Sequence, residues 1–119
     1  MGADDDNLFR VSFDRDGILG LSILFDLKME NAPEFFEGFE ATYGDHSTVV
    51  IDFSKIRFID SSGVGMLLKC AHIVRGKGGV FQILGLNRSL LSVFKLAGLF
   101  KIFELLEEPQ ARETYPEFF

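Results

Sequence analysis

The sequence predicts an α/β domain in which a mixed sheet of four or five strands carries helices mainly on one face. Short apolar segments rich in β-branched residues alternate along the chain with longer segments whose apolar residues recur every three to four positions. Such alternation is typical of a largely parallel sheet with right-handed crossovers. The first two strands follow each other directly, so we expect the sheet to begin with an antiparallel pair.

The first half of the chain contains two predicted strands and one helix. Residues 8–13 alternate loosely between apolar and polar side chains, which is typical of an edge strand. After a turn, residues 18–25 are nearly all apolar, as in a strand buried on both faces. A helix is predicted over residues 31–43, with Asn31 as its N-cap and Gly44 as its C-terminal stop.

The second half alternates more regularly. Residues 48–53 form a short β-branched strand, and residues 62–75 form the clearest helix, which ends in a glycine-rich turn. The remaining predicted elements are a strand at 80–84, a helix at 87–97 capped by Asn87, a short last strand at 100–105 and a terminal helix at 109–119.

Length and composition indicate a single domain. The chain has 119 residues, of which 47% are hydrophobic, and this is enough apolar material for one core. We expect residues 1–7 to be a disordered acidic N-terminus and residues 8–119 to form the domain. The net charge of −6 disfavours nucleic acids and anionic membrane surfaces as partners.

Cysteine content, hydropathy and motifs argue against several classes of function. Cys70 is the only cysteine, which fits a reducing compartment. The sequence has neither a signal-peptide pattern nor an apolar run of about 20 residues, so we expect a cytoplasmic protein without membrane insertion. His46 and His72 lack metal-ligand spacing, and no catalytic or nucleotide-binding pattern is present. We therefore expect no metal, no cofactor and no enzymatic activity.

The most informative segment is Asp60-Ser61-Ser62-Gly63, which follows a buried strand and opens the helix at 62–75. Asp and Ser are favoured N-caps because their oxygens accept the free N–H groups of a first helical turn. A helix N-terminus also stabilises added negative charge, so the same segment is compatible with a phosphorylation site. Local physics alone favours the capping role. Of the two serines, we expect Ser62 to turn into the first helical turn as a cap, and Ser61 to precede the helix with its hydroxyl exposed. Gly63-Val64-Gly65 predicts a closely packed helix start.

The neighbouring residues add a family resemblance. The stretches at 52–54 and 58–65 resemble the signature of the STAS domain family, and the similarity continues through the glycine turn, the strand at 80–84 and the segment at 93–103. Stand-alone bacterial members of this family include anti-sigma factor antagonists. The resemblance implies a STAS-like fold and phosphorylation of Ser61 by a partner anti-sigma kinase.

The resemblance further implies partner switching. The unphosphorylated antagonist would bind the anti-sigma factor and free the sigma factor, and phosphorylation would break that complex. The expected partners are an anti-sigma factor that acts as a serine kinase and a PP2C-like phosphatase, with the chain itself a monomer or weak dimer. The alternative is a STAS adaptor that is not phosphorylated, in a transport system or a stress-signalling complex. The expected partner-binding residues are Lys28, Asp60, Ser61, Ser62, Gly63, Met66 and Ile73.

Two of these expectations concern individual positions. Aligned with the family, Lys28 takes the place of a usual acidic residue in the loop after the second strand, where it could pair with a phosphate on Ser61; an alignment shifted by two gives that place to Asp26. On the helix at 62–75, the predicted core face is formed by Val64, Leu67, Leu68, Ala71 and Val74. Met66, Cys70 and Ile73 fall on another side, where they form either a docking stripe leading away from Ser61 or contacts with a neighbouring loop.

Overall fold

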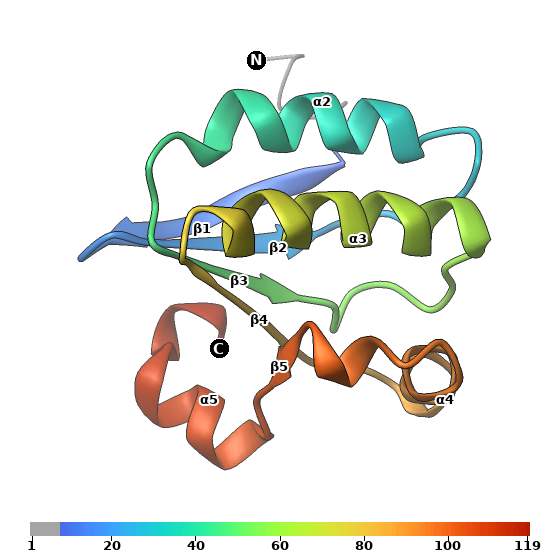
Figure 1. Cartoon of the computed structure of the whole chain (residues 1–119). Helices are drawn as coiled ribbons and strands as arrows, with labels where there is room; N and C mark the ends of the chain where they lie inside the picture. The colour runs from blue at the N-terminus through green and yellow to red at the C-terminus, as the bar shows by residue number, and fades with distance from the viewer. Residues whose placement is uncertain (1–7) are drawn as a thin grey trace.

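One mixed sheet of five strands, in the order β1-β2-β3-β4-β5, forms the centre of the molecule (Figure 1). The computed structural model describes residues 8–119, and the N-terminus at 1–7, which was expected to be disordered, lies outside them. β1 (Phe9–Arg15) and β2 (Ile18–Ile23) are antiparallel, as the sequence predicts. β2, β3 (Thr48–Asp52), β4 (Val80–Leu84) and the short β5 (Glu104–Leu105) are parallel.

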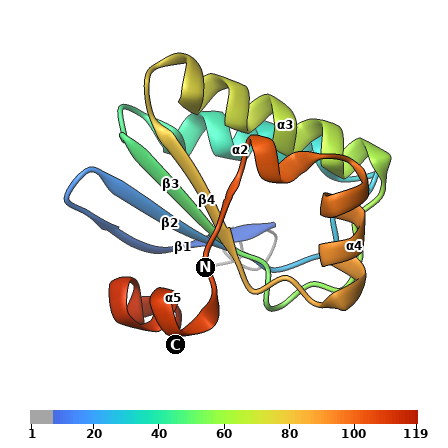
Figure 2. The same ribbon diagram turned by 60° about the horizontal axis from the view of Figure 1, so that its bottom comes forward.

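The helices lie mainly on one face of the sheet, which confirms the predicted fold class. α2 (Ala32–Tyr43) and α3 (Ser61–Gly76) run side by side over this face, and α4 (Arg88–Leu96) lies at one end of it (Figures 1 and 2). Their buried side chains form one large core with the inner face of the strands. α5 (Glu108–Thr114) lies on the opposite face, where it closes a smaller core.

A β-bulge in β1 allows this strand to contribute to both cores. The register with β2 shifts between Val11 and Phe13. Before the bulge, Phe9 packs edge to face on Phe35 of α2, with ring centroids 5.6 Å apart. After the bulge, Phe13 stacks on Tyr115 on the other face, with ring centroids 5.5 Å apart. A bulge places an extra residue in one strand and so reorients the side chains that follow it.

The C-terminal part differs from the prediction. The strand expected at 100–105 is instead a 3-10 turn at Leu99–Lys101 followed by the two residues of β5. Leu99 and Phe103 are both buried in the large core, so the chain must turn between them. The helix expected at 109–119 ends at Thr114, because Tyr115 leaves the helical conformation to bury its ring and a proline follows.

The second predicted strand is shorter in the structure, since the strand expected at 18–25 ends at Ile23.

At the far end of the sheet, the ring of His46 holds the β1–β2 turn against the end of α2. One ring nitrogen bonds the carbonyl oxygen of Tyr43, and the other lies 2.8 Å from a carboxylate oxygen of Asp14. The bond to the Tyr43 carbonyl is the main cause of a raised pKa of His46.

Candidate functional site

The segment around Ser61 is held by a main-chain frame at the carboxyl ends of β2 and β3. The loop after β2 and the loop before α3 form an isolated parallel bridge between Leu27 and Ile59. The N–H of Asp60 donates to the carbonyl oxygen of Leu27 at 3.1 Å. The parallel pairing of β2 with β3 is therefore repeated at one residue pair beyond the ends of these strands, immediately before α3 begins at Ser61.

Asp60 is the N-cap of α3 and also binds the opposite loop. Its Oδ1 accepts the N–H of Gly63 at 2.9 Å, and its Oδ2 accepts the N–H of Met29 at 2.9 Å. The bond from Gly63 is the largest cause of a lowered pKa of Asp60, with further contributions from the N–H groups of Met29 and Ser62 and from the charge of Lys28. Asp60 is therefore a fixed negative charge beside Ser61 at neutral pH.

The two serines have different positions from those expected. Ser62 was expected to serve as the cap, and this prediction is wrong because Asp60 takes that role. Ser61 is the first residue of α3 rather than a residue preceding the helix, and it is exposed, as predicted. Ser62 is half-buried at the second helical position. The exposed hydroxyl of Ser61 is thus the one that an approaching protein meets.

Gly63 allows α3 to begin directly on the bridge between the two loops. A Cβ atom at this position would lie 2.6 Å from Cγ1 of Ile59 and 2.7 Å from the carbonyl oxygen of Leu27. These distances are too short for non-bonded atoms, so the close approach requires glycine. The predicted close packing of the helix start is confirmed. Gly65, two residues later, has no such neighbour within 4 Å.

The loop that contains Lys28 is ordered by side-chain bonds to the main chain. The N–H of Lys28 donates to Oδ1 of Asn31, whose Nδ2 donates to the carbonyl oxygen of Asp26, both at 2.8 Å. Asn31 therefore closes this loop and makes no side-chain capping bond to α2, contrary to the prediction. The carboxylate of Asp26 accepts the N–H groups of Arg57 and Phe58, which ties the two loops together a second time.

Three large apolar side chains on these two loops are exposed, and the sequence analysis missed them. Phe25 is 49% exposed, Met29 69% and Phe58 52%. The main chains of Met29 and Phe58 lie in the bonded frame, because Met29 donates to Asp60 and Phe58 donates to Asp26. The frame therefore presents apolar side chains to solvent close to Ser61. Exposed apolar groups with a polar surround are typical of protein-binding surfaces.

The prediction of a docking stripe on α3 is wrong for Cys70 and Ile73. Cys70 is fully buried, and Ile73 is half-buried and packs against the large core. At 100° per residue, Ile73 lies about 120° and Met66 about 140° around the helix from Ser61. Lys69, on the same flank as Met66 and Ile73, lies over the ring of Phe36 in α2 at 4.5 Å, so this flank faces the neighbouring helix.

The face of α3 that is buried in the structure is rotated about the helix axis relative to the predicted core face. Val64 and Leu68, which were expected in the core, are only half-buried, while Cys70 takes a central place. Burial raises the pKa of the Cys70 thiol to about 12, so this thiol stays protonated at neutral pH.

Within residues 8–119, no group of three or more His, Cys, Asp or Glu side chains is arranged to hold a metal ion. In the same part of the chain, no helix has the length and apolar character needed to cross a membrane.

Comparison with known proteins identifies the class to which this fold and site belong. The model of the STAS domain family matches residues 14–115. The chain therefore belongs to the STAS domain family.

The names of individual relatives describe a narrower class of protein than the family description does. A protein from Paenibacillus polymyxa named anti-sigma F factor antagonist is 29% identical over 59 residues, which span 50% of this chain and 50% of that protein. This match therefore covers only about half the length of the relative. An anti-sigma factor antagonist from Mycobacterium paratuberculosis has a crystal structure that superposes with a TM-score of 0.71, at 26% identity over 82% of each chain. The phosphorylated form of the Bacillus cell fate determinant SpoIIAA superposes with a TM-score of 0.67, at 20% identity, over 88% of this chain and 96% of that one.

Proposed function

We propose that this chain is an anti-sigma factor antagonist whose binding to an anti-sigma factor is switched by phosphorylation of Ser61. The observation that carries the proposal is the placement of Ser61, an exposed hydroxyl at the start of α3, beside a surface of exposed apolar side chains. The names of the relatives support the class of partner. The phosphorylated state of one structural relative supports the kind of switch.

The charge balance around Ser61 explains how a phosphate would act. A phosphoserine adds a charge of about −1.5 to −2 at neutral pH. Asp60 is already ionised beside it, and its carboxylate uses the N–H groups of Gly63 and Met29. A partner that fits a neutral hydroxyl here would meet like-charge repulsion and would have to desolvate a dianion. Phosphorylation is therefore expected to weaken the complex.

The neighbouring apolar surface supplies the affinity in the unphosphorylated state. Phe58 and Met29 are held on ordered loops, so little conformational entropy is lost when a partner covers them. Aromatic and Met side chains are favoured at the centres of protein interfaces. Phe58→Ala is therefore expected to weaken binding of the anti-sigma factor at least about fivefold without preventing phosphorylation of Ser61.

The decisive experiment is phosphorylation in solution. The full chain is incubated with ATP, Mg²⁺ and the serine-kinase anti-sigma factor encoded by the same genome, and its intact mass is measured. We expect the mass of one phosphate to be added to the wild type and to Ser62→Ala, and none to Ser61→Ala. Ser61→Ala should keep the anti-sigma factor bound in the presence of ATP. Ser61→Asp should weaken binding, though less than phosphate does, because it carries less charge and fewer acceptor oxygens.

Lys28 provides a second measurement on the same system. Its charge lies near enough to Asp60 to contribute to the lowered pKa of that carboxylate, so it is also placed to attract a phosphate on Ser61. We expect Lys28→Ala to speed removal of the phosphate by a PP2C-like phosphatase. If the wild-type chain gains no phosphate and still binds its partner, the switch is refuted and the chain is a STAS adaptor without phosphorylation.

A further inference from the structure

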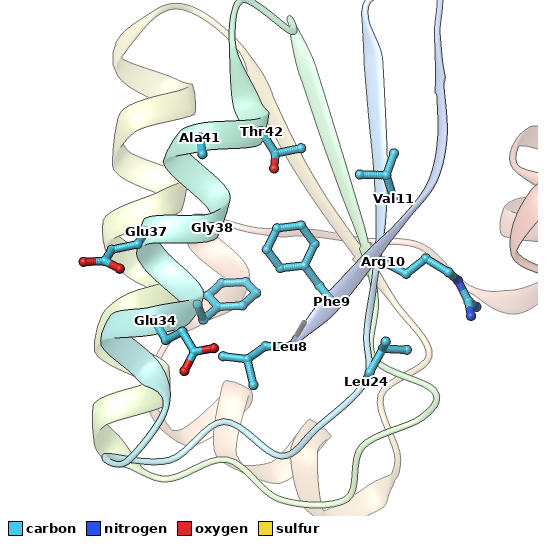
Figure 3. A pocket seen from close by; sticks show the side chains of 11 residues that line it. Leu8, Phe9, Arg10, Val11, Leu24, Glu34, Glu37, Gly38, Ala41 and Thr42 are labelled. Atoms are coloured by element: carbon cyan, nitrogen blue, oxygen red, sulfur yellow. The ribbon is translucent and has the colours of Figure 1, made fainter. Parts of the chain in front are cut away.

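A groove of about 810 Å³ runs between β1 and α2, away from the site around Ser61 (Figure 3). Phe9 and Val11 of β1 point into it, and α2 forms its other wall. Neither Ser61 nor any residue of the frame around Asp60 lines this groove. It is therefore a separate feature that the proposed switch does not use.

The outer edge strand of the sheet, β1, runs along this groove. β1 pairs only with β2, so within residues 8–119 its other edge has no strand partner. The N–H of Leu24 donates to the carbonyl oxygen of Leu8, and antiparallel pairs alternate between bonded and non-bonded. The N–H and C=O groups of Phe9 and Val11 therefore point away from β2, toward the groove side of the edge. Val11 is 45% exposed.

The depth of the groove depends on a glycine in α2. A Cβ atom at Gly38 would lie 3.0 Å from the ring of Phe9, so a larger residue there would meet this ring. Phe9 is held in turn by its edge-to-face contact with Phe35. The floor of the groove is thus a fixed apolar surface beside free main-chain groups, a combination that suits an extended peptide.

The charges at the rim select the kind of segment that fits. Glu34 and Glu37 on α2 are both exposed and line the groove. Figure 3 shows Glu34 beside Leu8 at the rim, Glu37 on the outer side of α2, directed away from β1, and the side chain of Arg10 pointing away from α2. A second copy added to β1 about a twofold axis would bring two such α2 helices, with their glutamates, next to each other. Like charges so placed repel, and each chain already carries a net charge of −6.

We propose that the groove binds an extended basic segment of a partner protein, which adds a short strand to β1. The free groups of Phe9 and Val11 supply the main-chain hydrogen bonds. Alternate apolar side chains of the segment enter the groove, and its Lys or Arg side chains lie against Glu34, while Glu37 adds negative charge on the outer side of α2. The bulge that follows Val11 limits the added strand to a few residues, because the regular edge ends there.

The test uses a capped six-residue peptide in which lysine and valine alternate, titrated into the isotopically labelled full chain and followed by NMR. We expect amide shift changes confined to residues 8–11, 24 and 34–42. The double variant E34K/E37K should raise the dissociation constant at least about fivefold, since the charge pair at Glu34 and the longer-range attraction of Glu37 both become repulsive. The matched control E107K/E113K makes the same charge change on exposed positions of the α5 segment and should bind as the wild type does.

Other variants separate the possible occupants. A peptide with glutamate in place of lysine should bind more weakly, and Val11→Pro should weaken binding by removing an outward N–H group. Equal binding by E34K/E37K or by the acidic peptide would overturn the proposal. So would a change of peptide affinity in Ser61→Asp, because it would place the peptide at the phosphorylation surface. A concentration-dependent dimer in sedimentation that Val11→Pro abolishes would assign the edge to a second copy and would also overturn it.

Discussion

Alanine at Gly63 tests whether α3 rests on the bridge between the two loops. The added Cβ would lie 2.6 Å from Ile59 Cγ1, 2.7 Å from the Leu27 carbonyl oxygen and 2.9 Å from Leu27 Cβ. Against a lower limit of 3.4 Å for ordinary contact, the shortfalls are between 0.5 and 0.8 Å. A carbonyl oxygen in a bonded main chain cannot rotate away, so the helix start itself must shift.

The expected magnitude follows from two opposed effects. Overpacking of this kind costs about 1–3 kcal/mol of unfolding free energy. Alanine is a better helix former than glycine by up to about 1 kcal/mol, although less is gained in the first turn. We therefore expect Gly63→Ala to destabilise the domain by about 0.5–3 kcal/mol. Gly65→Ala is the matched control, because it meets no atom within 4 Å and should stabilise by about 0.5–1 kcal/mol.

Urea denaturation followed by far-UV circular dichroism measures both variants. With a slope of about 1–3 kcal/mol per molar urea, the unfolding midpoints of the two variants should differ by about 0.3 M or more, with Gly63→Ala the lower. A midpoint for Gly63→Ala at or above that of the wild type would refute the close packing of α3 on the bridge. A loss of stability in Gly65→Ala would show that alanine is unfavourable even at a helix position without close neighbours, and this variant could then not serve as the control.

Three further outcomes are expected. Ile73→Asp should cost about 1–3 kcal/mol of unfolding free energy because Ile73 packs on the core. The control Leu96→Asp, at a position 89% exposed, should change this free energy by less than about 0.5 kcal/mol. Similar midpoints of the two variants in urea would show that Ile73 is a surface residue. Because the folded-state pKa of His46 is raised, its stabilising contribution is complete below about pH 6.5 and is lost as the pH rises through the folded-state value. His46→Gln should therefore reduce the decline of stability over that range, and an unchanged decline in urea denaturation at several pH values would contradict this role. Cys70 should react with a thiol reagent at neutral pH only as fast as the chain opens, and rapid labelling of the native protein would contradict its burial.

The fold could be predicted from the sequence because its elements carry strong local patterns. The buried β-branched run of β3 and the Asn87 cap of α4, which accepts the Leu90 N–H at 2.8 Å, appear in the structure as expected. The C-terminal part was predicted less well. Leu99 and Phe103 are apolar in a strand-like pattern, but both turn into the core, and this contact is set by distant elements.

The sequence predicts where the site lies, but not which side chain forms its hydrogen bonds. Three successive residues, Asp60 to Ser62, are all good caps, and local sequence does not choose among them. The choice is made by the N–H of Met29, which approaches from a loop 31 positions away and holds the carboxylate of Asp60. The wrong prediction that Cys70 lies off the core face of α3 has a similar cause. α3 contacts both the sheet and α2, so its buried face is wider and differently centred than a single apolar stripe implies.

The bridge between Leu27 and Ile59 also bears on how a signal at Ser61 would be transmitted. The main chain on both sides of the serine is held by bonds that do not involve its hydroxyl: Asp60 to Leu27, Asp60 to Gly63, and Asp26 to Phe58. Adding a phosphate breaks none of them. The two states of the proposed switch would therefore share one backbone shape and differ in local electric potential, so a partner would distinguish them by charge and not by a conformational change.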